Sequence, residues 1–356
     1  MSKLITMKEL KQSVARERTR NQVIGRTVTN DPEPIENHEI ENNIASIMEN
    51  KRMSATILSH KSGVSANIIR GLADHQTKSI KFDVLEALAN ALSVDYDTLL
   101  GRKPYLRKDE IDEQIETASI AFPKEIAYDV KGLLRAIGNG RGLHRILFHG
   151  PPGTGKTETA KLIAEITDVD LSIVQYEEMI DSHLGKTSKN ILSFFEDINL
   201  YNKPLIVLID EIDALALNRM QGNRDVQEMS RVTTTFMKGL DELNENITLI
   251  ATTNRFDELD QALIRRFQSH IDFGRYDDDS LLEVGLFIYE QRFVDEEQQT
   301  SDVDTFTKLT ENAIHDKHLT NPAEIERLLD NAFAYADEDP RSHLNHYKYF
   351  IQQFDQ

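Results

Sequence analysis

The sequence contains no cysteine and no tryptophan, and only nine of its 356 residues are proline. The absence of cysteine excludes disulfide bonds and thiolate metal sites and fits a chain that works in the cytoplasm. No apolar run approaches the roughly 18 residues that a membrane-spanning helix needs. The N-terminus, MSKLITMKELKQ, also lacks the apolar core of a signal peptide. We therefore expect a cytoplasmic protein with no membrane partner.

The residues that are present are typical of a globular protein with two or three domains. Hydrophobic residues make up 39% of the chain and charged residues 28%. The net charge of −19 is unevenly distributed. Residues 1–30 carry seven Lys and Arg against two Glu, whereas residues 276–356 carry six against nineteen Asp and Glu. A basic arm on an acidic body indicates a polyanionic partner at the N-terminal end only.

The clearest motif is GPPGTGKT, which occupies residues 150–157. It follows the apolar run 145–149 and precedes a helical pattern, which is the strand, glycine loop and helix order of a phosphate-binding P-loop. Lys156 is expected to reach the β- and γ-phosphates of a nucleotide, and the Thr157 hydroxyl is expected to bind Mg²⁺. The expected nucleotide-binding residues are Gly150, Pro151, Pro152, Gly153, Thr154, Gly155, Lys156, Thr157 and Glu158.

Two adjacent acids follow an apolar run that suits a central parallel strand, residues 203–209. They lie at the carboxyl end of that strand, where open α/β sheets bind ligands. Asp210 fits a residue that binds the nucleotide and holds Mg²⁺, partly through water. Glu211 fits the base that polarises the attacking water. Downstream of a P-loop, this pair predicts a hydrolytic site.

Further polar residues come after the next predicted strand, residues 247–253. Asn254 ends this strand and is expected to orient water between the acids and the γ-phosphate. Arg265 and Arg266 follow a short helix, and an arginine can neutralise the charge of the transition state from a neighbouring subunit. The predicted catalytic residues are therefore Glu211, Asn254, Arg265 and Arg266.

Several short helices are predicted between residues 38 and 101. A glycine turn precedes Ser65, which can cap a helix over residues 66–73, and another helix is expected over 82–92. The stretch, with its Gly63-Val64-Ser65 turn and Leu99-Leu100-Gly101 ending, resembles the phage-repressor-like (Cro/C1, or XRE) helix-turn-helix family.

In that family the third helix enters the major groove of DNA. The matching positions here are Ser65, Ala66, Asn67 and Arg70. Asn67 suits adenine, and Arg70 suits guanine or a phosphate. A small helical bundle used for protein contacts is the alternative.

The motifs downstream of residue 110 resemble those of the AAA ATPases, within the larger AAA+ group. They are GPPGTGKT, DEID at 210–213, ATTN ending at Asn254 and DQALIRRF at 260–267. The arginine pair looks most like the spastin/katanin-like subgroup. The resemblance implies an α/β P-loop domain with a parallel sheet, a small helical lid and a ring, usually hexameric. It also implies that residues 319–325 lie near the adenine.

In that family, the pore loop that grips the substrate carries an aromatic residue, an aliphatic residue and a glycine in succession. The matching residues here are His183, Leu184 and Gly185. The histidine keeps a planar ring, loses apolar area and can become charged. Two histidine pairs, His315/His318 and His343/His346, have no evident third ligand and are expected at the surface.

Five regions are expected along the chain. They are a basic flexible arm (1–35), a helix-turn-helix domain (36–101), a linker (102–110), an AAA large domain (111–275) and a helical lid (276–356). The predicted function is Mg²⁺-dependent ATP hydrolysis by a homo-oligomeric remodeller of a protein or nucleoprotein. It is expected to be of prokaryotic or phage origin and to be recruited to DNA through residues 1–101. The alternatives are an ATP-switched DNA-binding regulator and an adaptor for a separately encoded effector.

Overall fold

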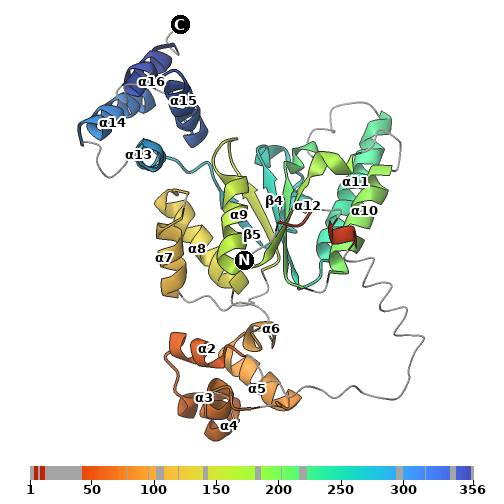
Figure 1. Cartoon of the computed structure of the whole chain (residues 1–356). Helices are drawn as coiled ribbons and strands as arrows, with labels where there is room; N and C mark the ends of the chain where they lie inside the picture. Colours follow the sequence, from red (N-terminus) through yellow and green to blue (C-terminus); the bar gives the residue numbers. More distant parts are fainter. Residues whose placement is uncertain are drawn as a thin grey trace.

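The structure is a computed structural model (Figure 1). It describes residues 4–6, 9–12, 42–77, 79–94, 96–101, 108–118, 120–138, 143–180, 186–201, 203–215, 223–293, 300–316, 318–336 and 342–353. Within these ranges, no helix is both long enough and apolar enough to cross a membrane. The described chain contains a helical region, an α/β region and a second helical region, in the predicted order.

The first helical region has the predicted helix-turn-helix pattern. Its helices are α2 (Ile44–Asn50), α3 (Ala55–Ser62), α4 (Ala66–Ala73), α5 (Phe82–Leu92) and α6 (Tyr96–Leu99). The side chain of Ser54 caps α3, and that of Ser65 caps α4 by accepting from the Ile68 amide at 3.4 Å. Gly63 adopts a φ of 72° at the end of α3, a conformation that favours glycine. Buried aliphatic side chains from α2 to α5 form the core of this region.

The α/β region is built on one parallel sheet. Its strands are β1 (Arg145–His149), β2 (Asp170–Gln175), β3 (Leu205–Asp210), β4 (Ile247–Thr253) and β5 (Ser269–Asp272). The spatial order is β2-β3-β4-β1-β5, so β2 and β5 are the edges. All described pairings are parallel. The central strands β3 and β4 are buried along nearly their whole length, which confirms the expectation from their apolar runs.

Helices cover both faces of this sheet (Figure 1). The cluster on one face joins it to α7 (Lys108–Glu116), α8 (Lys124–Gly138) and α9 (Lys156–Thr167). The cluster on the other face joins it to α10 (Lys186–Asn199) and α11 (Asn223–Asp241). Neighbouring residues of one strand point to opposite faces, because side chains alternate along a strand. Thus Ile146 packs in the first cluster and Leu147 in the second.

Short helical turns follow or precede the strands along the chain. They are η1 (Tyr176–Met179), η2 (Ile212–Leu215), η4 (Phe256–Glu258) and α12 (Gln261–Ile264).

The second helical region contains α13 (Asp278–Phe293), α14 (Thr300–His315), α15 (Pro322–Ala334) and α16 (Ser342–Gln352). An aromatic cluster lies at its centre, with the rings of Tyr289 and Phe306 stacked at 4.3 Å. His343 joins this cluster, with Nε2 3.1 Å from the Tyr289 hydroxyl and only 5% of its surface exposed. The expectation that His343 lies at the surface is therefore wrong. The aromatic neighbours that bury it come from other helices.

The N-terminal arm also differs from expectation in its described part. Leu4 forms a parallel β-bridge with Leu171 of β2. Ile5 and Leu10 are buried in the core that the sheet shares with α10 and α11. Residues 4–6 and 9–12 are therefore placed against the α/β region, because the Ile5 and Leu10 side chains are buried in its core.

Candidate active site

The phosphate loop follows β1 and leads into α9. Gly150, Gly153 and Gly155 all have positive φ angles, which glycine adopts without strain. A Cβ atom at Gly150 would lie 2.7 Å from the backbone nitrogen of Gly274, so no side chain fits there. Gly155 then caps α9, whose first residue is Lys156. The loop thus presents the N-terminus of a helix to a bound anion.

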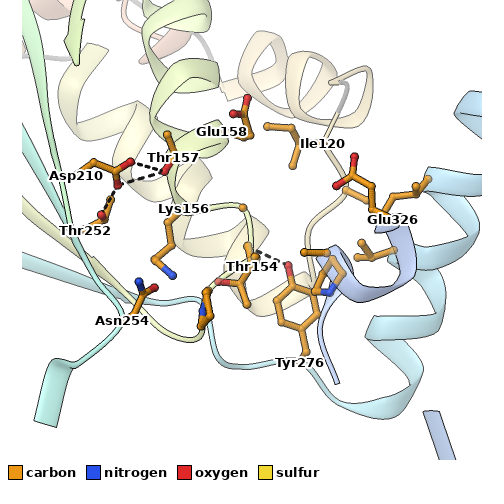
Figure 2. Close-up of a pocket in the computed structure, with 18 of the residues that line it drawn as sticks. Ile120, Thr154, Lys156, Thr157, Glu158, Asp210, Thr252, Asn254, Tyr276 and Glu326 are labelled. Carbon is orange, nitrogen blue, oxygen red and sulfur yellow. Dashed lines mark hydrogen bonds between the residues drawn. The ribbon is translucent and has the colours of Figure 1, made fainter. Parts of the chain in front are cut away.

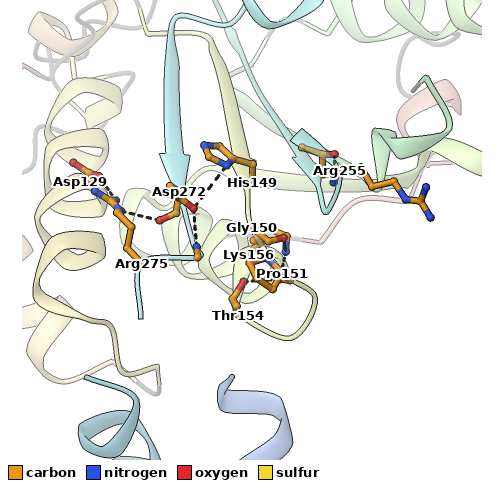
Figure 3. Close-up of polar contacts among 11 residues, drawn as sticks. Asp129, His149, Gly150, Pro151, Thr154, Lys156, Arg255, Asp272 and Arg275 are labelled. Carbon is orange, nitrogen blue, oxygen red and sulfur yellow. Dashed lines mark hydrogen bonds and ion pairs between the residues drawn. The ribbon is translucent and has the colours of Figure 1, made fainter. Parts of the chain in front are cut away.

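The Lys156 side chain folds back into this loop (Figure 3). Its ammonium donates to the carbonyl oxygens of Gly150 at 2.8 Å and Pro151 at 2.6 Å. Burial lowers the pKa of Lys156 to about 8, although nearby carboxylates, Asp213 foremost, act to raise the pKa. A buried cation held by weak carbonyl dipoles is suited to exchange them for phosphate oxygens.

Asp210, at the end of β3, lies beside the first turn of α9 (Figure 2). The Thr157 hydroxyl is 3.1 and 3.3 Å from its two carboxylate oxygens. The Thr252 hydroxyl, from the neighbouring strand β4, donates to Asp210 Oδ1 at 2.5 Å. Thr157 and Asp210 therefore form a pair of hard oxygen donors, which is the ligand type that Mg²⁺ prefers.

Glu211 has an uncommon backbone conformation, with a φ of 56°. Residues other than glycine adopt this left-handed region rarely and at a cost in energy. Its amide donates to the Thr252 hydroxyl at 2.9 Å, and its side chain is exposed and lines the cavity. Thr252 thus contacts both neighbouring acids, one through the side chain and the other through the backbone.

The end of β4 is joined to the turn η2 by a second set of contacts. The Asp213 carboxylate accepts from the Thr253 hydroxyl and from the Asn254 amide, the latter at 3.0 Å. The Asn254 side-chain oxygen is buried and has no hydrogen-bond partner among the described residues. Asn254 is therefore fixed through its backbone, and its side chain retains an acceptor beside Lys156 (Figure 2).

A cavity of about 400 Å³ extends from these polar groups to the second helical region. At its apolar end the walls are Ile120, Ala121, Val284, Phe287, Ile288, Pro322 and Ala323. The Tyr276 hydroxyl donates to the Thr154 carbonyl at 3.4 Å, and burial raises the pKa of Tyr276 to about 12. A Cβ atom at Gly153 would lie 2.4 Å from the Cβ of Ala323, so the phosphate loop touches the start of α15. The cavity has a polar end and an apolar end, as a nucleotide requires.

The structure brings most of the predicted site residues together. Loop residues 152–158, Asp210, Glu211 and Asn254 line the cavity. Gly150 and Pro151 do not line it, and their carbonyl oxygens instead hold the Lys156 ammonium. Glu158 lines it but also forms a 2.5 Å ion pair with Lys161.

The two predicted arginines lie away from the cavity of their own chain. Arg265 is exposed. Arg266 is partly buried, with Nε 3.5 Å from the Asp241 carboxylate and Nη1 donating to the Ala262 carbonyl at 2.9 Å. The predicted pore residues His183, Leu184 and Gly185 lie outside the described residues.

Several contributors to the site were not expected from the sequence. Thr252 and Asp213 were parts of recognised motifs, but their contacts depend on how β3 and β4 are aligned. Tyr276 and the apolar wall from α13 follow only from the position of the second helical region. The run 319–325 was expected near the adenine, and its Pro322 and Ala323 do line the cavity.

The predicted DNA-contacting residues lie at the beginning of α4. The Ser65 side chain caps the helix, and Ala66 is its first residue. Asn67 and Arg70 are exposed and joined by a 3.1 Å hydrogen bond from Arg70 Nη1 to Asn67 Oδ1. This pair leaves the remaining guanidinium and amide donors at the surface of the helix.

Comparison with known families agrees with the geometry of the loop, acids and asparagine. Residues 146–275 match the sequence profile of the "ATPase family associated with various cellular activities (AAA)". The chain contains an AAA ATPase domain. Residues 43–104 match the profile described as "Cro/C1-type HTH DNA-binding domain". The AAA match spans the sheet that builds the nucleotide site, and the second match spans α2 to α6.

The AAA domain has many curated relatives. The chain is 33% identical over 215 residues to "Proteasome-activating nucleotidase 1" of Haloferax volcanii, which covers 59% of this chain and 49% of the relative. It is 38% identical over 141 residues to "Putative 26S proteasome regulatory subunit homolog MJ1494" of Methanocaldococcus jannaschii, covering 39% of this chain and 38% of the relative. A homologous subunit from Methanothermobacter marburgensis is 32% identical over 216 residues, with coverage of 59% and 55%. The chain thus spans about half the length of the relatives it matches.

Proposed function

We propose that this chain hydrolyses ATP with Mg²⁺ at the cavity between the phosphate loop and α15. The proposal rests on the convergence of four side chains at the polar end of one cavity. They are the loop lysine, the two acids at the end of β3 and Asn254, which follows β4. The opposite end is apolar, and the cavity as a whole has the volume of a small-molecule pocket. The match to the AAA family supports the same reaction.

Each polar group has a distinct role in this proposal. Lys156 and the loop amides bind the phosphates, while Thr157 and Asp210 hold Mg²⁺, which neutralises the charge of the transferring phosphoryl group when bound. Glu211 accepts a proton from the attacking water, and its exposed side chain leaves room for that water. Asn254 orients the same water through its unpaired side-chain oxygen.

We further propose that the chain works in the cytoplasm as a homo-oligomeric, hexameric ring that remodels a macromolecule. Arg265 is exposed and lies outside its own cavity, which suits a group that acts on the nucleotide of a neighbouring subunit. The relatives named as proteasome-activating nucleotidases support a protein substrate. The helix-turn-helix region would recruit the ring to DNA through Ser65, Ala66, Asn67 and Arg70.

Replacing Glu211 with glutamine tests the hydrolytic role. The amide keeps the shape of the side chain but cannot accept the proton. We expect ATP turnover to fall by at least about 100-fold, the scale of general-base catalysis, while binding of ATP measured by calorimetry stays within about twofold. Asp168→Asn, at the far end of α9, serves as a surface control. Normal turnover by Glu211→Gln would refute the assignment of the base.

A second function, an ATP-switched DNA-binding regulator, is favoured by the exposed Asn67 and Arg70 pair on α4. Duplex DNA, single strands and unfolded protein should be compared as stimulators of the ATPase rate across a salt series. A remodeller is expected to respond to its substrate and a regulator only to duplex DNA. DNA contacts must weaken as salt rises because counterions are released on binding. Loss of DNA binding in Asn67→Ala and Arg70→Ala would support recruitment, and unchanged binding would refute it.

A further inference from the structure

The edge of the sheet is occupied by the beginning of the chain. Leu4 pairs in parallel with Leu171 of β2, and the Ile5 amide donates to the Leu171 carbonyl at 2.8 Å. β2 is an edge strand, so its outer backbone groups have no strand partner within the sheet itself. An extended peptide that adds to such an edge is a recurring mode of peptide recognition. Here the peptide precedes the helix-turn-helix region, and β2 follows it.

Two buried apolar side chains hold this segment against the α/β region. Ile5 is 7% exposed and Leu10 is fully buried, and both belong to the cluster that contains Phe194 and Ile198 of α10. Figure 1 shows the short red helix of residues 9–12 beside α10. Leu4 differs, because 61% of its surface is exposed. Alternate residues of the extended part thus face the core and the solvent, as β-addition requires.

The segment also carries its own turn. The Thr6 amide and hydroxyl donate to the Glu9 carboxylate at 2.9 and 3.0 Å, and the Glu9 amide donates to the Thr6 hydroxyl at 3.3 Å. This reciprocal arrangement is a capping box, which fixes the start of a helix. It sets the path between Ile5 and Leu10 so that both side chains reach the same core.

We propose that the outer edge of β2, together with α10, is a docking site for the chain's own N-terminal segment, residues 4–6 and 9–12. Docking attaches the helix-turn-helix region to the ATPase domain at a second point, in addition to the direct connection through residues 102–110. β2 continues through η1 toward the predicted pore residues, so this attachment lies on the strand that precedes them. The proposal depends on the contacts of β2 and α10 and is independent of whether the helix-turn-helix binds DNA.

The proposal is tested by cleaving the chain between the N-terminal segment and the helix-turn-helix region and measuring whether the segment stays bound. A site for a specific protease is placed in the full-length chain between residues 25 and 30, and the cleaved protein is run on a sizing column without denaturant. We expect the N-terminal fragment to co-elute with the rest of the chain at tens of micromolar protein. Its immediate separation would overturn the proposal.

Matched variants locate the contact. In the double variant Ile5→Asp and Leu10→Asp, the fragment should separate after cleavage, because two carboxylates cannot be buried in an apolar core without partners. Leu4→Asp is the control, and its fragment should be retained because that side chain is exposed. Circular dichroism of each uncut variant checks that the remainder is folded. Retention of the double-variant fragment would also overturn the proposal, since binding would then not involve the buried side chains.

Discussion

The Thr252 hydroxyl joins the two neighbouring acids of the candidate site. It contacts the Asp210 carboxylate and the Glu211 amide together, and it is 1% exposed. No other described residue is recorded as bonding to both acids. Its removal would leave the Glu211 amide without its partner, and an unsatisfied group of this kind costs about 1–3 kcal/mol. Among the described residues, the Asp210 carboxylate would keep only its contact with the Thr157 hydroxyl.

We expect Thr252→Val to reduce kcat by about tenfold, equivalent to about 1.4 kcal/mol, with little change in the KM for ATP. Valine keeps the branched shape and loses only the hydroxyl. Thr252→Ser restores the hydroxyl and should recover most of the rate, a rescue that a purely packing role would not give. Steady-state kinetics of the three proteins is the measurement, and a valine variant with the wild-type kcat would contradict this role.

The proposed role of Lys156 makes nucleotide binding dependent on pH. Its pKa in the free protein is lowered to about 8 by burial, and phosphate oxygens would raise this pKa because they favour the charged ammonium. ATP binding should therefore take up protons near pH 8, and affinity should fall as pH rises above that value, by up to about tenfold per pH unit. Calorimetry in buffers of different ionisation enthalpy measures this uptake.

Arginine at this position is the matched control, because its guanidinium remains charged throughout the range. Lys156→Arg should lose the proton uptake near pH 8 even if its affinity for ATP is weaker. Uptake that persists in this variant would assign the titration to another group.

At the scale of elements, the close packing of α10 against α11 depends on a glycine, which has no side chain. A Cβ atom at Gly239 of α11 would lie 2.1 Å from the ring of Phe195 on α10. We expect Gly239→Ala to lower the free energy of unfolding by about 1–3 kcal/mol, since overpacking forces neighbours to move. Urea unfolding followed by circular dichroism measures the change.

At Gly132 of α8, in the same domain, a side chain would have room. A Cβ atom there would meet nothing within 4 Å, so Gly132→Ala should stabilise the helix by about 0.4–1 kcal/mol. Equal effects of the two substitutions would show that helix propensity, and not contact with Phe195, decides the result at both positions.

The elements that the sequence predicted best are those with a strong local signal. The P-loop strand, the apolar runs of β3 and β4, and the serine-capped helix α4 are present close to the predicted residues. Strand β5 (Ser269–Asp272) was not predicted, because four residues with a single buried apolar side chain, Ile271, give little periodicity. The contact of the N-terminal segment with β2 was not predicted, for another reason. Its partner, β2, is more than 150 residues away, and its basic composition favoured a solvated arm.

The same distinction holds for the site. Lys156, Asp210 and Glu211 were predictable, because each belongs to a contiguous sequence motif that indicates its chemical role. Thr252 and Asp213 acquire their contacts from the alignment of neighbouring strands, and most of the apolar wall of the cavity comes from helices in the C-terminal region. Such contacts depend on tertiary structure and have no local signature.

At the scale of the whole molecule, the two arginines have different surroundings. Arg266 is paired with Asp241 of its own chain, whereas Arg265 is exposed. We expect Arg265→Ala to abolish turnover and to be rescued by mixing with Glu211→Gln. In a mixed ring, some sites combine an intact Glu211 with an intact Arg265 from the neighbour.

We would measure the ATPase rate of the mixture and compare it with the rates of the two separate variants. Light scattering would follow the mass of the particles. Arg266→Ala is the comparison, and its effect should appear mainly as lower stability because its contacts lie within the chain. If mixing recovers no activity while mixed particles form, Arg265 does not act across subunits.

The left-handed backbone at Glu211 has a consequence for how this chain can change over evolutionary time. A glutamate in this conformation costs about 1–2 kcal/mol relative to glycine. Sequences that lose hydrolysis by placing glycine or asparagine at this position would relax the strain and gain stability. The proposed role of Glu211 in turnover and the stability of this peptide therefore favour different residues at the same position.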